Sequence, residues 1–233
     1  MFLSPRLQKV ADLVPDCHTL ADIGTDHGYI PLYLIRQSRV KHAIAADINA
    51  GPLDKARRLI EHNKLSHCIE TRLGNGLSVL LPGEADVIVI AGMGGVLISR
   101  ILMQGVEAAS KAYALILQPM TGQPELRRWL IQNGYGITDE ELAKEGHRIY
   151  EIIVAVPNER TPEYEKDIFC DIGWKLIEKK HPLLKEWVES KIMGLKEILS
   201  RLENGKTEEA AARVEELKEK RRQYEEVYHC LIK

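Results

Sequence analysis

The sequence predicts an α/β fold with a mostly parallel sheet that ends in an antiparallel hairpin, followed by an all-helical segment. Over the first half of the chain, short apolar runs typical of strands alternate with amphipathic stretches typical of helices. Two strand-like runs then follow one another with no helix between them, and after Pro157 charged residues recur at helical spacing. We therefore expect two domains, residues 1–157 and residues 158–233.

The composition is that of a globular protein. Of its 233 residues 45% are hydrophobic, which is sufficient for a sizeable core. No apolar run reaches the roughly 18 residues that span a bilayer, and the N-terminus lacks the apolar stretch of a signal peptide. We therefore expect a cytoplasmic protein with no membrane partner.

The charges and cysteines exclude other classes of protein. Lys and Arg number 32 against 34 Asp and Glu, so the chain lacks the overall basic character typical of nucleic-acid-binding proteins, although a local basic patch stays open. The four cysteines form no CxxC pair, so we expect neither a zinc site nor a disulfide framework, and no metal; they are Cys17, Cys68, Cys170 and Cys230.

The first predicted element is a short amphipathic helix over residues 4–14. Ser4 suits the N-cap and Pro5 the first helical position. The alternating pattern then predicts strands at 19–24, 42–47, 67–72, 86–91 and 113–118. Helices are expected at 28–37, after a cap at Asn49, at 94–104 and at 123–133.

Residues 135–142 and 148–156 form the strand-like pair. Only residues 143–147 separate them, so they should form an antiparallel hairpin. Five parallel strands closed by such a pair resemble the methyltransferase variant of the Rossmann fold, whereas a dehydrogenase would normally continue with a sixth parallel strand.

The C-terminal part predicts two long helices. A helix start is expected at Thr161-Pro162-Glu163, and Pro182 opens a pattern with Leu184, Trp187, Val188, Leu195, Ile198 and Leu202 apolar. Residues 203–206 read as a turn, and Thr207 as the cap of a helix with apolar Val214, Leu217, Tyr224, Tyr228 and Leu231. We expect an antiparallel, coiled-coil-like hairpin. Arg221 falls on its apolar seam and marks the register, a contact site or a solvated hairpin end.

The turn after the first predicted strand is the first candidate site. Gly24 and Gly28 let the backbone approach a ligand, and the next helix presents free N–H groups there. Asp26 stands where a dinucleotide-binding turn has its middle glycine, and a carboxylate would repel a pyrophosphate. S-adenosyl-L-methionine (SAM) instead offers an ammonium and a sulfonium, which Asp22 and Asp26 would favour. The alternative is a turn whose glycines serve packing alone.

Three further turns follow predicted strands. Asp47 can accept hydrogen bonds from ribose hydroxyls, or is a capping or loop aspartate. Asn75, followed by Gly76, can pair with an adenine, or belongs to a hairpin-type Asn-Gly turn. Residues 90–95 (Ile-Ala-Gly-Met-Gly-Gly) leave room for a cofactor and its target, or serve tight helix–strand packing.

These motifs resemble one known family. Residues 21–29, 90–95 and 115–119 together are similar to the TrmK family of bacterial tRNA (adenine(22)-N1)-methyltransferases, which modify the tRNA D-arm, and residues 3–7 resemble that family's start. The resemblance spans residues 3–156 in order, and the helical hairpin after them resembles the family's C-terminal part. Asp-Ile-Gly-x-Asp-His combined with Ile-Ala-Gly-Met-Gly-Gly is more specific than either motif alone.

The resemblance implies a ligand set for SAM: Asp22, Gly24, His27, Gly28, Asp47, Ile48, Asn75, Gly76, Ala91, Gly92, Met93 and Gly94. It also implies that tRNA contacts the N-terminal helix, basic residues near the cofactor and the helical hairpin, with Arg6, Met93 and Pro119 as substrate residues. The acidic or Asn residue followed by two prolines and an aromatic, common in amino-methylating enzymes, is missing after the fourth strand, so no catalytic residue carries over from it.

The expected reaction is direct methyl transfer to N1 of adenine. N1 has a lone pair, so the protein mainly orients the reactants. Asp26 is a candidate to stabilise the cationic product or accept a proton from N6, and His27 is a candidate proton relay; each is alternatively a cofactor ligand or a structural hydrogen-bonding group. N1 lies on the pairing edge, so the target base must be unpaired or flipped.

Positive charge gathers in the first quarter of the chain, at Arg6, Lys9, Arg36, Arg39, Lys41, Arg57 and Arg58. Arg6 is the preferred RNA contact because its helix should lie beside the cofactor turn, although a solvated surface is the alternative. A small-molecule methyltransferase and a non-catalytic SAM- or RNA-binding protein stay open as other functions. We expect a monomer or weak dimer.

Overall fold

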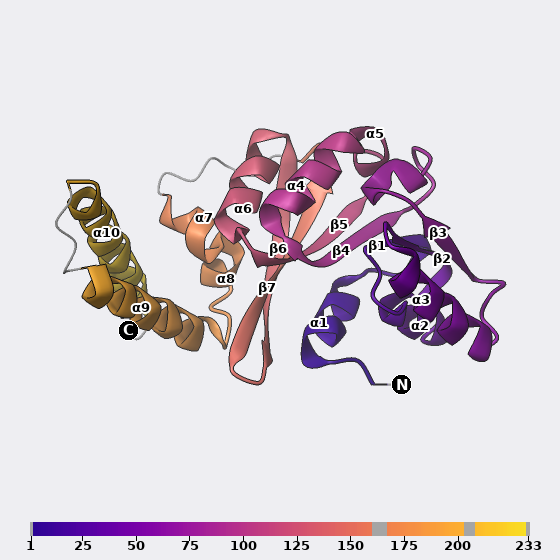
Figure 1. Cartoon of the computed structure of the whole chain (residues 1–233), viewed down its shortest axis with the longest axis horizontal. Helices are drawn as coiled ribbons and strands as arrows, with labels where there is room; N and C mark the ends of the chain where they lie inside the picture. Colours follow the sequence, from indigo (N-terminus) through magenta and orange to yellow (C-terminus); the bar gives the residue numbers. More distant parts are fainter. Residues whose placement is uncertain (1, 160–166, 203–207, 232–233) are drawn as a thin grey trace. The chain divides into compact units, whose positions relative to one another are not determined.

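The structure, a computed structural model, describes residues 2–159, 167–202 and 208–231. It divides into two compact units, Met1–Glu163 and Tyr164–Lys233 (Figure 1). The helix start predicted at Thr161, the turn at 203–206 and the cap at Thr207 lie outside the described residues. Within the described residues, no helix is both long and apolar enough to cross a membrane.

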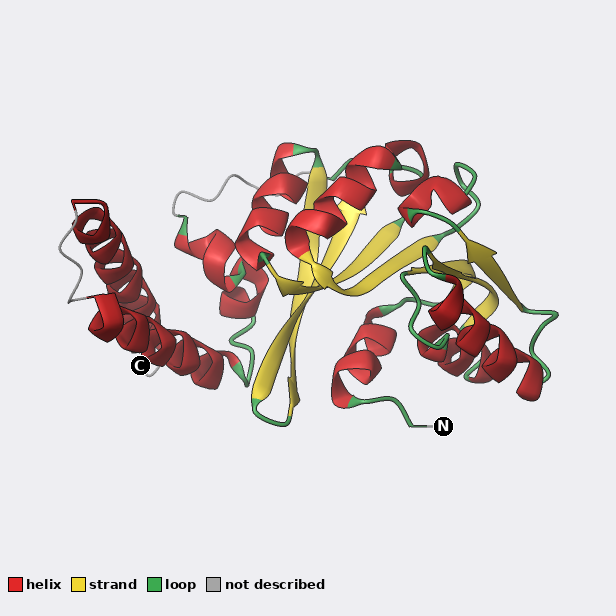
Figure 2. Ribbon diagram, in the orientation of Figure 1, coloured by secondary structure: helices red, strands yellow, loops and turns green. Residues whose placement is uncertain are grey.

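The larger unit is built on a seven-stranded sheet in the order β3-β2-β1-β4-β5-β7-β6 (Figure 2). The strands are β1 Cys17–Ile23, β2 Val40–Asp47, β3 Ile69–Leu73, β4 Val87–Gly94, β5 Ala114–Thr121, β6 Tyr135–Glu145 and β7 Arg148–Pro157. The first five are parallel, whereas β7 pairs antiparallel with both β5 and β6. The predicted methyltransferase-type sheet is therefore confirmed.

Alternate residues of the strands enter two separate cores, because successive side chains of a strand point to opposite faces. Ile88, Ile90 and Leu117 pack with the helices of one face, whereas Val87, Val89 and Ile116 pack on the other. Figure 1 shows α4 and α6 on the first face and α1, α2 and α3 on the second. The helices of this unit are α1 Pro5–Leu13, α2 Tyr29–Arg36, α3 Ala50–His62, η1 Gly76–Val79, α4 Gly95–Gln104, α5 Val106–Ala109 and α6 Gln123–Gln132.

The ends of several elements follow the predicted local chemistry. Ser4 Oγ accepts a hydrogen bond from the Leu7 N–H at 3.5 Å, and Pro5 opens α1. Asn49 takes the N-cap position of α3, but its side chain makes no capping hydrogen bond. The β6–β7 connection is shorter than expected, since only Gly146 and His147 lie between the strands.

The fourth strand differs from its prediction. It continues to Gly94 rather than ending at Ala91, and its register against β5 shifts at Met93 and at Gly94. Such irregularities re-aim side chains at the end of a strand. The segment predicted as a turn after the fourth strand is therefore an irregular strand end.

The smaller unit is helical, with α7 Ile168–Ile172, α8 Trp174–Glu178, α9 Leu184–Leu202 and α10 Glu208–Leu231. The early part of α9 meets the late part of α10: the rings of Trp187 and Tyr224 lie 6.1 Å apart, and Lys185 Nζ, earlier in α9, lies 5.7 Å from the ring centroid of Tyr228, later in α10. The two long helices are thus antiparallel, as expected.

Candidate active site

The larger unit contains a cavity of about 280 Å³ at the carboxyl ends of β1, β4 and β5. The chain runs from β1 to β2 on one side and returns to β4 on the other, and ligands bind at such switch points of parallel sheets. The cavity is lined by Arg6, Leu7, Asp22, Gly24, Asp26, Tyr29, Ile30, Ala91, Gly92, Met93 and Met120.

The turn after β1 brings backbone close to the cavity. The N–H groups of Gly24 and Thr25 both donate to Ala46 O, at 2.8 and 2.9 Å, which anchors the turn to β2. Gly24 has a φ of +74°, and a Cβ added there would lie 1.9 Å from Met93 Cε. A side chain at this position would therefore enter space used by Met93 and the cavity.

Asp22 supplies a buried carboxylate to the same wall. Its side chain accepts a hydrogen bond from Thr25 Oγ1 at 2.6 Å, and the residue is only 5% exposed. Burial raises the pKa of this carboxyl group from 3.8 to about 6. A cation beside it would offset the cost of burying the ionised form, so the turn fits the ammonium and sulfonium of SAM.

Asp26 and His27 form a pair on this turn. The Asp26 carboxylate is largely exposed and lies against Nδ1 of His27. The His27 ring stacks on Tyr29, with centroids 5.3 Å apart and planes 7° apart. Asp26 and Tyr29 line the cavity, whereas His27 and Gly28 are not among its lining residues.

Gln118 is fully buried in β5 and contacts two residues of the cavity lining, Arg6 and Gly92. Its Oε1 accepts hydrogen bonds from an Arg6 guanidinium N–H at 2.7 Å and from the Gly92 N–H at 3.2 Å. Its amide nitrogen donates to Pro119 O at 3.0 Å. The Arg6 guanidinium also lies 5.6 Å from the centroid of the Tyr150 ring.

The ends of β2 and β3 lie beside each other, since the Gly74 N–H donates to Asp47 O at 3.0 Å. Asp47 Oδ1 accepts the Asn49 N–H at 2.6 Å, and Ile48 is 61% exposed. Asn75 is the N-cap residue of η1, so no β-hairpin forms at this turn, and the contact of Asn75 with an adenine stays a prediction. None of these residues lines the cavity itself.

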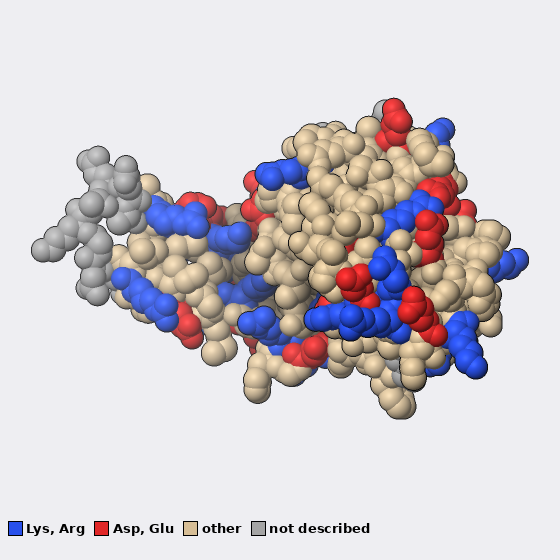
Figure 3. All heavy atoms as spheres, turned by 45° about the vertical axis from the view of Figure 1, so that its right-hand side comes forward, with Lys and Arg blue, Asp and Glu red and all other residues tan. Residues whose placement is uncertain are grey.

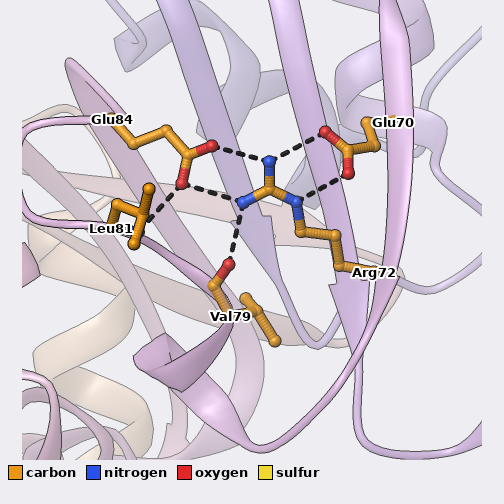
Figure 4. Close-up of polar contacts among 5 residues, drawn as sticks. All are labelled: Glu70, Arg72, Val79, Leu81 and Glu84. Carbon is orange, nitrogen blue, oxygen red and sulfur yellow. Dashed lines mark hydrogen bonds and ion pairs between the residues drawn. The ribbon is translucent and has the colours of Figure 1, made fainter.

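Arg72 holds the connection that follows β3 (Figure 4). Its guanidinium donates to both carboxylate oxygens of Glu70, to both of Glu84 and to Val79 O. These bonds use all five donors of the side chain. Hydrogen bonding to Arg72 lowers the pKa of both carboxyl groups, and the network fixes η1 next to Asn75.

The basic residues near the N-terminus have different environments. Arg39 donates to Ala11 O, Val14 O and Asp16, so it caps the end of α1. Further ion pairs engage Lys9 with Glu141 and Arg57 with Asp54, whereas Lys41 and Arg58 are exposed. On the face of the larger unit seen in Figure 3, positive and negative side chains are interspersed.

The structure thus brings together seven predicted site residues around one cavity: Arg6, Asp22, Gly24, Asp26, Ala91, Gly92 and Met93. His27, Gly28, Asp47, Ile48, Asn75, Gly76, Gly94 and Pro119 lie outside its lining. Tyr29, Met120 and Gln118 were not predicted as site residues. Tyr29 directly follows the glycine turn, and a buried glutamine in an apolar strand is itself unusual; these were the available signals.

The parallel sheet closed by an antiparallel hairpin, with its cavity at the strand ends, defines a Rossmann-like methyltransferase domain. Residues 3–153 match the family model described as "Methyltransferase domain". The chain is 38% identical over 192 residues to the tRNA (adenine(22)-N(1))-methyltransferase of Bacillus subtilis (strain 168), covering 80% of each protein. It belongs to this family of tRNA methyltransferases.

Solved structures of similar proteins support the same family. The crystal structure described as the B. subtilis M1A22 tRNA methyltransferase TrmK has a TM-score of 0.88 at 33% identity, covering 97% of this chain and 99% of that one. Streptococcus pneumoniae Sp1610, described as a putative tRNA (m1A22) methyltransferase in complex with S-adenosyl-L-methionine, has a TM-score of 0.87 at 30% identity, covering 98% of this chain and 100% of that one.

Proposed function

We propose that this chain transfers a methyl group from SAM to N1 of adenine 22 in the D-arm of tRNA. The observation that supports this most strongly is the 38% identity to the B. subtilis enzyme of that name, over 80% of both chains. The cavity adds a physical reason, because two carboxylates and positive-φ glycines meet at the carboxyl ends of parallel strands.

SAM supplies an electrophilic methyl group when it is bound. Asp22 holds its carboxylate where a cationic amino-acid moiety needs it, and Gly24 and Gly92 leave room for backbone contact. Asp47 with Ile48 receives the ribose, and Asn75 with Gly76 receives the adenine. The remaining proposed cofactor contacts are His27, Gly28, Ala91, Met93 and Gly94.

The target adenine must reach the cavity with its pairing edge exposed. Asp26 is exposed at the rim and paired with His27, so the pair can take up a proton or stabilise the cationic product. Tyr29, whose ring stacks on His27, lines the cavity together with Asp26. Met93, Pro119 and Arg6 are the proposed substrate contacts.

The proposal extends to the domain that contacts tRNA, the cellular compartment, the oligomeric state and the need for a metal. Residues 158–233 form a separate domain that contacts tRNA through the helical hairpin, and the protein acts in the cytoplasm, where tRNA is modified. It works as a monomer or weak dimer and needs no metal.

The test is incubation with labelled SAM and two unmodified tRNAs, one with adenine and one with guanine at position 22. We expect label in the first tRNA only. Equal labelling of both would refute the position, and SAM binding without labelling of either would favour a small-molecule methyltransferase or a non-catalytic protein. Failure to bind SAM would overturn both enzyme functions.

A further inference from the structure

Gln118 is a buried polar residue that the proposed reaction does not use. It ends the apolar run Ala114–Leu117 of β5, and its side chain is completely inaccessible to solvent. Burying an amide is costly unless its hydrogen-bonding groups are satisfied. The structure satisfies it with Arg6 and Gly92, which line the cavity, and with the neighbouring Pro119 O.

The chemistry of these partners fixes the orientation of the amide. The Arg6 guanidinium and the Gly92 N–H can only donate, and Pro119 O can only accept. Rotating the amide by half a turn would oppose donor to donor and acceptor to acceptor. Gln118 Oε1 therefore points to Arg6, and one N–H of the guanidinium is held at 2.7 Å.

Arg6 is held from two further sides. Its backbone N–H, in the first turn of α1, donates to Glu145 Oε2 at 3.2 Å, and its guanidinium lies over the Tyr150 ring. Both neighbours come from the β6–β7 hairpin. The side chain is thus fixed in the cavity wall by a neutral amide and an aromatic ring.

The positive charge of Arg6 is nevertheless not neutralised. Within the described part of the chain, no carboxylate forms an ion pair with its guanidinium, whereas Arg39 and Arg57 each contact one carboxylate and Arg72 and Arg127 each contact two. An arginine that is half-buried, immobilised and unpaired at a cavity wall is suited to bind an anionic group of a ligand. A flipped nucleotide brings its own phosphates to the edge of such a cavity.

We propose that Gln118 is a positioning residue that holds Arg6, with its charge free, for a phosphate next to the target adenosine. This inference rests on the proposed function. It explains why a neutral glutamine, rather than a glutamate, contacts the arginine: a carboxylate would neutralise Arg6, and it would also lack the hydrogen that Gln118 donates to Pro119 O.

The test measures tRNA affinity, the KM for tRNA at saturating SAM, and the affinity for SAM, in four variants. These are Arg6→Met, Gln118→Met, the double variant, and Gln118→Glu; Arg100→Met, an exposed arginine of α4, is the control for loss of one charge. We expect each of the two single methionine variants to weaken tRNA binding about tenfold. The double variant should be no weaker than Arg6→Met alone, because Gln118 acts through Arg6.

Gln118→Glu separates the effect of the Arg6 charge from the effect of the hydrogen bonds that hold Arg6. It keeps the acceptor for Arg6 and Gly92 and loses only the donor to Pro119 O, so SAM affinity should stay within about twofold while tRNA binding falls as in Arg6→Met. Arg6→Met should also lower the slope of log affinity against log salt by about 0.7–0.9, the value for one phosphate contact. Arg100→Met should reproduce none of the tenfold loss.

Several results would overturn the inference. Additive losses in the double variant would show that Gln118 acts independently of Arg6. A loss of SAM affinity in Arg6→Met with unchanged tRNA binding would assign Arg6 to the cofactor's carboxylate instead. Unchanged tRNA binding in Gln118→Glu would show that the charge of Arg6 is irrelevant. Binding is measured without turnover, so a wild-type protein that binds tRNA but methylates nothing would refute the proposed function separately.

Discussion

We expect the buried carboxylate of Asp22 to make SAM binding dependent on pH. Burial raises its pKa to about 6, so the group is mostly ionised at pH 7 and mostly protonated at pH 5. Only the ionised form attracts the ammonium and sulfonium of SAM. We therefore expect the affinity for SAM to fall as the pH drops through 6.

The size of the effect follows from the fraction of ionised Asp22. With a pKa of about 6, that fraction falls from about 90% at pH 7 to about 10% at pH 5. If binding requires the ionised form, the Kd for SAM rises about tenfold over this interval. Isothermal titration at half-unit steps between pH 5 and 7 measures it.

Two variants separate Asp22 from other titrating groups. Asp22→Asn should bind SAM weakly at every pH, with a flat profile, whereas His27→Gln should keep the tenfold change. The carboxyl's rise in pKa means that its protonated form stabilises the fold below pH 3.8 and that this contribution is lost as the pH rises through about 6. At pH 7 the folded protein buries an ionised carboxylate at Asp22, which costs up to about 3 kcal/mol of stability. Asp22→Asn removes this cost, so the variant should be no less stable than the wild type at pH 7. A wild-type affinity that is constant between pH 5 and 7, or a tenfold change that persists in Asp22→Asn, would refute the reasoning.

Four further predictions concern the glycines, the buried ion pairs and the helical unit. Gly24→Ala should weaken SAM binding at least tenfold in a titration, because its Cβ displaces the Met93 methyl group and the φ of +74° disfavours alanine; Gly51→Ala, whose Cβ would meet nothing within 4 Å, is the control and should bind normally. Gly95→Ala should lower the free energy of unfolding by about 1–3 kcal/mol in urea, because a Cβ there would lie 2.1 Å from Gly122 O. An unchanged midpoint of unfolding would contradict the close approach of α4 and α6. Arg127→Met should lower the free energy of unfolding by about 3–5 kcal/mol in the same assay, since it leaves the buried carboxylates of Glu140 and Glu151 without the arginine that they contact. A loss below about 1 kcal/mol would show that water reaches these carboxylates. Removing residues 158–233 should weaken tRNA binding in a filter assay but spare SAM binding, and the opposite pattern would refute the assignment of tRNA contact to the helical hairpin.

Local patterns were sufficient to predict the sheet and one edge of the site. The turn at Gly24 follows β1, and Met93 lies in the irregular end of β4. The carboxyl ends of parallel strands meet at one edge, so the meeting of these two segments at the cavity could be expected from the order of elements. The preference for Arg6 rested on the same reasoning about its helix.

Residues whose position depends on long-range packing could not be predicted in this way. Gln118 contacts Arg6 only because α1 docks beside β5, across 112 residues of sequence. Met120 lines the cavity where the register of β4 against β5 shifts, between the pairs Met93–Pro119 and Gly94–Thr121. The short helices η1 and α5 were missed since they contain too few residues to show a period.

The position of the methyl group on tRNA tests the central claim most directly. Unmodified tRNA is incubated with the protein and SAM, cleaved by a ribonuclease and examined by mass spectrometry for the fragment that contains nucleotide 22. We expect a gain of one methyl group on adenine 22 and release of 1-methyladenosine on complete digestion. A methyl group on another nucleotide, or on another atom of adenine 22, would contradict the proposed function.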